Sequence, residues 1–263
     1  MDRARRRPPL FVAAVAVLAV AFFALPLIGL LQRASLSTFG ADLTSPEALA
    51  ALRLSLVCSL SATVLSVALG LPLAWCLARV AVPGKAFVRA LVLLPLVLPP
   101  VVGGVALLAA FSKTGIVGAR LFDWFGIQFT FNIAGAVLAE TFVALPFFVI
   151  TVEGALRSMD PRFEDVAATL GAGRWTTFRR VTVPLIAPSL VAGAVLSWAR
   201  ALGEFGATIT FAGNIEGRTQ TLPLAVYLML ESNADTAIAL SLVLLAVSLL
   251  VIVLLRDRWL ARA

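Results

Sequence analysis

Long apolar stretches alternate with short polar ones along this chain of 263 residues. A membrane core about 30 Å thick is crossed by an α-helix of roughly 20 apolar residues. Six segments satisfy that length, namely 10–31, 52–77, 90–111, 133–152, 184–209 and 236–255. The pattern therefore predicts an all-α, polytopic membrane protein with six transmembrane helices.

The same pattern divides the chain into three parts. We expect an N-terminal transmembrane helix with an external segment over 1–51, a core over 52–255 and a cytoplasmic tail over 256–263. Within the core, the third segment contains the run LLPLVLPPVVGG at 93–104. Because each proline removes a backbone hydrogen bond and bends a helix, this segment is predicted to be a helix built to bend.

Composition agrees with a lipid environment. The sequence is 61% hydrophobic and 13% charged, whereas soluble globular chains carry about 25% charged residues. Its formal charge of +7 would suit a nucleic-acid partner, but the arginines lie between apolar segments and form no patch with interleaved aromatic residues. Contact with membrane lipid explains that placement better. We therefore expect no nucleic-acid partner.

The basic residues also predict an orientation, because they concentrate on the cytoplasmic side of a membrane. With the N-terminus inside, 15 of the 21 Lys and Arg fall in inner segments, five in outer segments and Arg200 within a span. Both termini are thus expected in the cytoplasm of a multi-pass protein of the inner (plasma) membrane. Arg3, Arg5, Arg6 and Arg7 precede the first segment, as in a signal peptide, but its apolar run of about 22 residues exceeds the roughly 7–15 of a signal sequence. We expect it to be uncleaved, and cleavage would leave the other spans unchanged.

Several kinds of chemistry are excluded by what the sequence lacks. There is no His, so a His general base, a His-ligated metal or haem, and Ser–His or Cys–His nucleophiles are unavailable. The phosphate-loop pattern is also absent, so the chain should not hydrolyse nucleotide itself. Cys58 and Cys76 fall in one predicted helix about 27 Å apart and cannot pair within it. We expect no enzyme activity, no metal and no cofactor.

A polar island at 164–188, EDVAATLGAGRWTTFRRVTVPLIAP, interrupts two apolar stretches. A helix can begin at Asp160 or Pro161, and the carboxylates of Glu164 and Asp165 would then lie near its N-terminus, where the helix dipole favours negative charge. Gly171 is placed to end this helix in the left-handed conformation.

A second short helix is predicted at about 173–181. It carries Arg174, Arg179 and Arg180 beside Trp175 and Phe178, and exposed aromatics next to charges are typical of an interface. Two prolines, Pro184 and Pro188, would mark the return into lipid. Physical reasoning leaves two interpretations open: a surface that a soluble partner contacts, or an amphipathic loop in the lipid headgroup region.

The spacing of this island resembles the EAA loop of ABC-importer permeases. That pattern reads E-A-A, three residues, G, nine residues, I, one residue, L-P, and here it becomes Asp165-Val166-Ala167, Gly171, Val181, Val183 and Pro184. The resemblance implies a type I importer permease fold, in which 160–183 is a cytoplasmic coupling loop seated in a groove of an ATPase subunit. The residues it assigns to coupling are Glu164, Asp165, Ala167, Gly171, Trp175, Phe178, Arg179 and Pro184. Asp165 stands where the family usually has Glu, so either Glu164 or Asp165 could meet the ATPase.

A second resemblance covers 198–232. The run Arg200–Gly206 (RALGEFG) is similar to both oxyanion branches of these permeases, whereas 207–211 (ATITF) and 221–227 (TLPLAVY) look more like the molybdate branch than the sulfate/thiosulfate branch. The family likeness implies a homodimer with the pathway at its two-fold axis. It also implies two cytoplasmic ATPase subunits and an extracytoplasmic substrate-binding protein, whose contact could be the polar loop at 214–220.

Charged residues also occur within the spans. On one continuous helix, Ser197, Arg200, Glu204 and Thr208 would form a stripe about 80° wide, and charge at that depth must face the bundle interior, a cavity or a partner. Counted along their helices, Arg200 and Glu140 lie at similar depth in the outer leaflet. We interpret Glu140, Ser197, Arg200, Glu204 and Thr208 as an outer gate or pathway set. A static clamp between helices is the alternative.

The leading hypothesis is the permease subunit of a binding-protein-dependent ABC importer for molybdate. Sulfate, thiosulfate or tungstate is the alternative cargo within the family. An ion-coupled secondary transporter would need ionisable residues near the bilayer midplane, and Arg200, Glu204 and Glu140 are expected further out. An intramembrane enzyme of the Ser–His or metal type would normally need His, which is absent.

Overall fold

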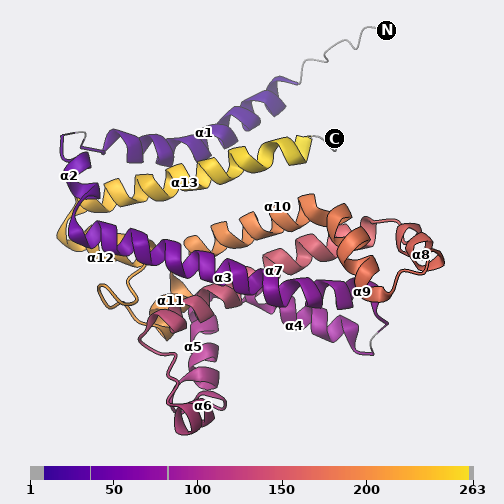
Figure 1. The fold of residues 1–263 in the computed structure, drawn as a ribbon. Coiled ribbons are helices and arrows are strands. Elements are labelled where there is room, and N and C mark those ends of the chain that lie inside the picture. Colours follow the sequence, from indigo (N-terminus) through magenta and orange to yellow (C-terminus); the bar gives the residue numbers. More distant parts are fainter. Residues whose placement is uncertain (1–8, 36, 82, 261–263) are drawn as a thin grey trace.

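Three long helices, α3 (Pro46–Arg79), α7 (Ile133–Ser158) and α10 (Val183–Leu202), form the centre of the molecule. The computed structural model describes residues 9–35, 37–81 and 83–260, with side chains to Val253. The predicted basic cluster Arg3, Arg5, Arg6 and Arg7 lies outside these residues, as do the side chains of the tail predicted at 256–263. Figure 1 shows α3, α7 and α10 running alongside one another, with α4 beside them.

The remaining elements surround this bundle. They are α1 (Leu10–Gln32), α2 (Phe39–Leu43), α4 (Lys85–Val97), α5 (Pro100–Phe111), α6 (Gly118–Phe125), α8 (Arg162–Thr169), α9 (Arg174–Thr177), the π-helical turn η1 (Phe178–Thr182), α11 (Gly206–Phe211), α12 (Leu222–Ser232) and α13 (Ala234–Leu260). The described part of the chain contains no strand, which agrees with the all-α prediction. Both cysteines lie in α3 and are free thiols.

Five described helices are long and apolar enough to cross a membrane: α1, α3, α7, the continuous helix Arg174–Leu202, and α13. The remaining predicted segment, 90–111, which is the third along the chain, is divided into α4 and α5 at Leu98 and Pro99. Leu98 is extended because the residue before a proline is forced out of the helical region. The expected bend is therefore a full break, and α5 turns away from the direction of α4 (Figure 1).

Two expectations about the fifth span are wrong. The basic helix predicted at 173–181 is not separate, because α9, η1 and α10 follow one another without interruption, and Pro184 lies in the first turn of α10, where a missing N–H is tolerated. The span does not reach residue 209 as one helix either. It ends at Leu202, and α11 begins at Gly206.

Small residues let the central helices approach closely, as is common within membranes. The buried ring of Phe148 on α7 lies between α3 and α10, where added Cβ atoms at Gly70 and Gly193 would come within 2.6 and 3.2 Å of it. The α5–α11 contact works in the same way. A Cβ on Gly104 would lie 2.6 Å from Thr210 Cβ and 3.0 Å from the carbonyl oxygen of Ala207.

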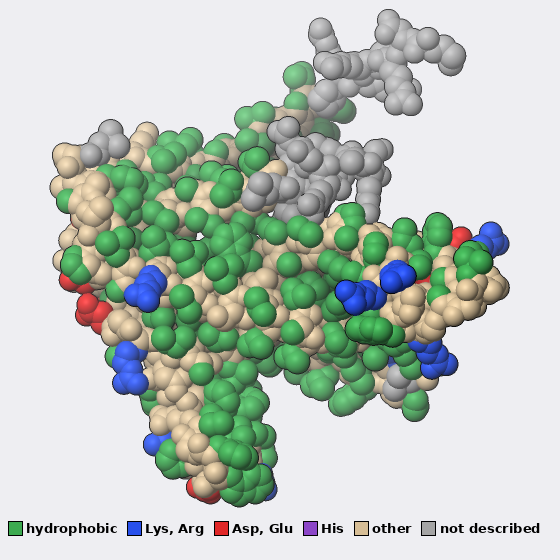
Figure 2. Space-filling model, viewed as in Figure 1, with side chains coloured by type: hydrophobic (Ala, Val, Ile, Leu, Met, Phe, Trp, Pro, Cys, Tyr) green, Lys and Arg blue, Asp and Glu red, His purple; other side chains and the backbone are tan. Residues whose placement is uncertain are grey.

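The surface matches a protein that crosses a membrane. Figure 2 shows hydrophobic side chains over most of the visible face, with charged side chains gathered toward its two ends. One end carries α8 and α9, and the other carries α2, α12 and the loops beside α11 (Figure 1). Polar backbone and side-chain groups are thus kept away from the zone that lipid would cover.

The close α5–α11 packing predicts that Gly104→Leu destabilises the protein. Overpacking of this kind costs about 1–3 kcal/mol, which corresponds to a fall of several degrees in the thermal unfolding midpoint of the purified protein. Gly29→Leu on α1 is the matched control, because nothing lies within 4 Å of an added Cβ there. Equal midpoints for the two variants would contradict this packing.

Candidate functional site

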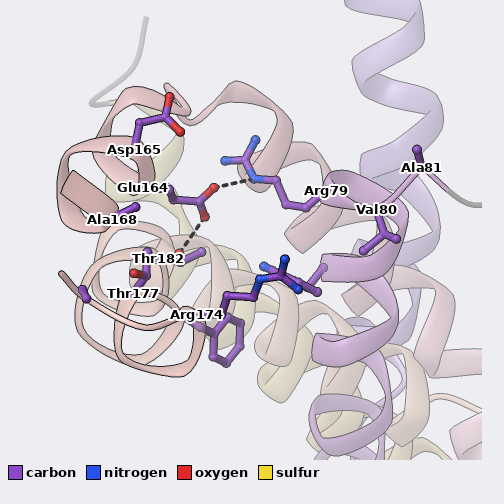
Figure 3. A pocket seen from close by; sticks show the side chains of 12 residues that line it. Arg79, Val80, Ala81, Glu164, Asp165, Ala168, Arg174, Thr177 and Thr182 are labelled. Carbon is purple, nitrogen blue, oxygen red and sulfur yellow. Dashed lines mark hydrogen bonds and ion pairs between the residues drawn. The ribbon is translucent and has the colours of Figure 1, made fainter.

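The loop 160–183 is joined to the bundle by the side chain of Glu164, in the first turn of α8. Its Oε2 atom lies 3.2 Å from Nε of Arg79 at the end of α3, and its Oε1 atom accepts a hydrogen bond of 2.7 Å from Thr182 Oγ1 in η1. Figure 3 shows Glu164 pointing toward both partners. Ala167 is the one buried residue of α8, so apolar burial contributes little there. Glu164 therefore ties α8 to α3 and to the start of α10.

Asp165 occupies the neighbouring position but faces outward. Its side chain is exposed and, among the described residues, makes no hydrogen bond or ion pair. Exposed apolar side chains accompany it on α8, with Val166 58% and Leu170 83% exposed. One of the two adjacent carboxylates is thus used inside the protein, and the other is free for a partner.

Gly171 ends α8 as expected, with φ of 82°. The N–H groups of Gly171 and Ala172 donate to the carbonyl oxygens of Ala168 and Ala167 at 3.0 Å each, which is the Schellman arrangement. Beyond this turn lies a cavity of about 420 Å³, bounded by α3, α8 and α9, with Arg79, Glu164, Asp165 and Arg174 in its wall (Figure 3).

Aromatic rings form the side of the loop next to the membrane. Trp175 is 70% exposed and stacks on Phe178 at 5.6 Å, while Phe178 meets Trp75 of α3 edge-on at 6.2 Å. Phe178 begins the π-helical turn, a feature often found at functional sites. Arg179 and Pro184 are exposed on the same helix. The predicted interface aromatics are therefore present, with Trp175 on the surface and Phe178 packed inward.

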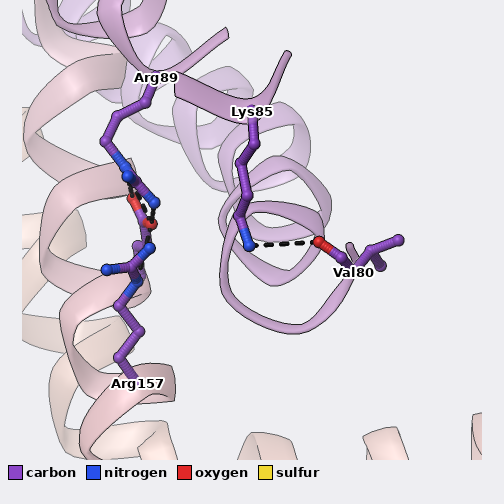
Figure 4. Close-up of polar contacts among 5 residues, drawn as sticks. Val80, Lys85, Arg89 and Arg157 are labelled. Carbon is purple, nitrogen blue, oxygen red and sulfur yellow. Dashed lines mark hydrogen bonds and ion pairs between the residues drawn. The ribbon is translucent and has the colours of Figure 1, made fainter. Parts of the chain in front are cut away.

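A second charged cluster fixes α4 to α7 near the same end. Arg89 of α4 and Arg157 of α7 both reach the carboxylate of Glu153, and Arg157 Nε lies 3.0 Å from Glu153 Oε1 (Figure 4). Glu153 is 7% exposed, so its charge is compensated by two arginines rather than by water. This cluster holds the inner half of the broken third segment against α7.

The predicted outer set divides into two groups. Arg200 Nη2 lies 2.6 Å from Glu204 Oε2, and Glu204 Oε1 accepts a 2.7 Å hydrogen bond from the N–H of Ala207. Glu204 thus pairs with α10 and caps α11 at the break between them. The expected continuous stripe is wrong, because Gly203–Phe205 is not helical. Ser197 faces inward instead and donates to the carbonyl oxygen of Ala144 at 3.1 Å.

Glu140 and Thr208 are the second group. They are 1% and 0% exposed, and no described residue supplies a hydrogen-bond partner for Glu140 Oε2 or Thr208 Oγ1. The pairing expected between Arg200 and Glu140 does not occur among the described ion pairs. The part of the chain with described side chains also holds no group of three Cys, Asp or Glu arranged to bind a metal.

This geometry, with an exposed loop at one end of a bundle of long apolar helices, can be compared with known proteins. The family model for the binding-protein-dependent transport system inner membrane component matches residues 66–263. The chain belongs to this family. It is therefore a permease, a membrane component of a transport system and not an enzyme.

Individual relatives of the permease are similar over most of its length. The molybdenum transport system permease protein ModB of Mycobacterium bovis is 48% identical over 93% of this chain and 92% of its own. The protein of the same name in Escherichia coli K12 is 46% identical over 84% and 96%. The sulfate transport system permease protein CysT of Escherichia coli K12 is 39% identical over 80% and 76%.

The fold of the permease matches a solved structure as well. A bacterial ABC transporter involved in the import of the acidic polysaccharide alginate superposes with a TM-score of 0.76 at 20% identity, covering 95% of this chain and 94% of that one. At such low identity the likeness concerns the fold alone. It agrees with the all-α importer architecture.

Sequence reasoning missed the residues that hold the loop in place. Arg79, Arg89 and Arg157 contributed only to the count of basic residues, and Glu153 was given no role. Thr182 carried no signal at all. A Glu near the inner end of a span, with several arginines on the same side, could have suggested ion pairs. The pattern does not say which residues form them.

The Arg79–Glu164 pair predicts a local effect on α8. Its side chains are 16% and 22% exposed, so Arg79→Gln should remove about 0.2–1 kcal/mol. We expect amide hydrogen exchange in 162–170 to accelerate up to about fivefold, because α8 opens more often. Arg162→Gln, on an exposed arginine of α8, should leave exchange unchanged. If the two variants exchange alike, the pair does not hold α8.

Proposed function

We propose that this permease is the transmembrane subunit of a binding-protein-dependent ABC importer that translocates molybdate, driven by a separate ATPase. The supporting observation on cargo is the order of similarity, since two molybdenum permeases are 48% and 46% identical and the sulfate permease 39%. The runs at 207–211 and 221–227 point the same way. Sulfate, thiosulfate or tungstate is the alternative cargo.

The single observation that carries the coupling role is that two adjacent carboxylates have different surroundings. Glu164 is engaged with Arg79 and Thr182, and Asp165 is exposed beside Val166 and Leu170. Asp165 therefore makes the polar contact with the ATPase, with the exposed apolar side chains of α8 and Trp175 around it. Glu164 acts inside the permease, where its contacts with Arg79 and Thr182 transmit movement of α8 to α3 and α10.

The proposed orientation follows from this contact. The end of the molecule that carries α8 faces the cytoplasm, where the ATPase is, and α1 begins and α13 ends toward that same side (Figure 1). Both termini are then cytoplasmic. The loop at 214–220, on the opposite side, is available to a substrate-binding protein. Its backbone is ordered by hydrogen bonds from the N–H groups of Arg218, Thr219 and Gln220 to the carbonyl oxygen of Ile215.

A homodimer with two ATPase subunits completes the proposal. One copy leaves apolar surface on the broken third segment, where Val101, Val102 and Val105 of α5 are 53%, 48% and 54% exposed. A second copy related by a two-fold axis would cover this face and enclose a pathway between the copies. Arg200 and Glu204 lie at the α10–α11 break next to α5, which suits an outer gate better than a static clamp.

Reconstitution tests the proposed function directly. The permease, its ATPase and its binding protein are placed in proteoliposomes, and ATP-dependent uptake of molybdate is measured in the presence of tungstate or sulfate. We expect molybdate uptake that sulfate inhibits at least tenfold less effectively than tungstate, whose ion has nearly the same size and charge. Preferential uptake of sulfate would favour the alternative cargo. Uptake of molybdate without the ATPase would contradict the coupling mechanism.

The coupling assignment has its own prediction. Asp165→Lys places a positive charge against the group of the ATPase that receives the carboxylate of Asp165. Contact between like charges costs several kcal/mol. Binding of the ATPase should weaken at least tenfold, measured by its co-purification and by light-scattering titration, while the unfolding midpoint of the permease stays the same. The control Glu216→Lys changes the same charge on the exposed loop at the other end. Equal ATPase binding by both variants would refute the role of Asp165.

A further inference from the structure

Glu140 is an acidic side chain that no charged group balances. It lies on α7 inside the bundle, 1% exposed in a single copy of the chain, so partners can only bury it further. Glu140 makes none of the ion pairs found among residues with described side chains. An isolated carboxylate in such surroundings costs far more free energy than a neutral acid.

The surroundings of Glu140 are sealed on both sides along α7. One turn toward the outer end, Ala136 packs with Leu54, Cys58 and Ala212. One turn toward the inner end, Ala144 packs with Ala62 and Ala201. Glu140 is therefore held in a layer between two apolar clusters, which leaves little room for water to solvate a charge.

The titratable groups that interact electrostatically with Glu140 cannot neutralise it. They are the thiol of Cys58 on α3 and the carboxylate of Glu204 at the α10–α11 junction. Glu204 is itself 1% exposed and pairs with the guanidinium of Arg200, which makes no ion pair with Glu140 among the described side chains. A buried carboxyl group with a second carboxylate nearby and no cation of its own favours the protonated form.

Of the two carboxylates, Glu140 is the one without a compensating partner. Both oxygens of Glu204 are engaged, by Arg200 and by the N–H of Ala207. No described residue donates to Glu140 Oε2. We propose that Glu140 is a buried proton-binding site, uncharged in the folded permease.

This assignment has a consequence for pH. Because the proton is bound in the folded state and released in the unfolded state, the stability that it contributes is present in full only at acidic pH, where an unfolded-state glutamate is protonated too. It is lost progressively as the pH rises from there through neutrality into the alkaline range. A glutamine at position 140 has nearly the same size and is uncharged at every pH, so it should remove this pH sensitivity.

Infrared spectroscopy of the purified permease in lipid tests the proposal, independently of transport and of the cargo. At neutral pH the wild type should show the carbonyl stretching band of a protonated carboxyl group, and Glu140→Gln should lose it. Glu153→Gln is the matched control on the same helix, because Glu153 forms ion pairs with Arg89 and Arg157. The band should persist in that control. A band that is absent from the wild type, or unchanged in Glu140→Gln, would overturn the proposal.

Thermal unfolding gives a second readout. At mildly acidic pH, Glu140→Gln should unfold within about 2 °C of the wild type, and on raising the pH to the alkaline range the wild-type midpoint should fall by at least about 2–4 °C more than that of the variant. If Glu140→Gln fails to fold, or loses stability with pH as the wild type does, Glu140 is required as a charged group and the proposal is wrong.

Discussion

The carboxylate of Glu164 joins the loop 160–183, which has almost no core of its own, to a bundle built from long apolar helices. It lies between Arg79 at the end of α3 and Thr182 in the turn that leads into α10. With Ala167 as the one buried residue of α8, polar contacts decide where this helix is held. A force on α8 therefore reaches two central helices through one side chain, and the neighbouring Asp165 remains free to receive it.

The end of the bundle away from α8 uses charge differently. Glu204 fills the break between α10 and α11, binding Arg200 on one side and the N–H of Ala207 on the other. The broken third segment places α5 against α11, where Gly104 and Gly206 allow the two helices to touch. The break before α5 and the break before α11 thus lie next to each other. Under the proposed mechanism, movement of α10 at the end that carries α8 would act at these breaks.

The sequence predicted the helical class, the approximate positions of the five long helices and the turn at Gly171, because these depend on local apolar length and on the conformational freedom of one glycine. The i, i+4 spacing of Arg200 and Glu204 also pointed to their contact. The break at Gly203–Phe205 was not predicted, because no proline marks it and the capping of Ala207 by Glu204 is decided in three dimensions. The role of Glu164 was open for the same reason: Arg79 lies 85 positions earlier in the chain.

The central claim is that α8 moves together with the inner end of α3. Spin labels on the exposed native Cys76 of α3 and on Thr169→Cys of α8, in copies diluted with unlabelled ones, allow that distance to be measured in the full transporter by pulsed electron resonance. The account predicts that the distance between Cys76 and Thr169→Cys within one copy is the same with and without ATP. The distance between the two Thr169→Cys sites of a fully labelled dimer should change. A change within one copy as large as that between copies would contradict it.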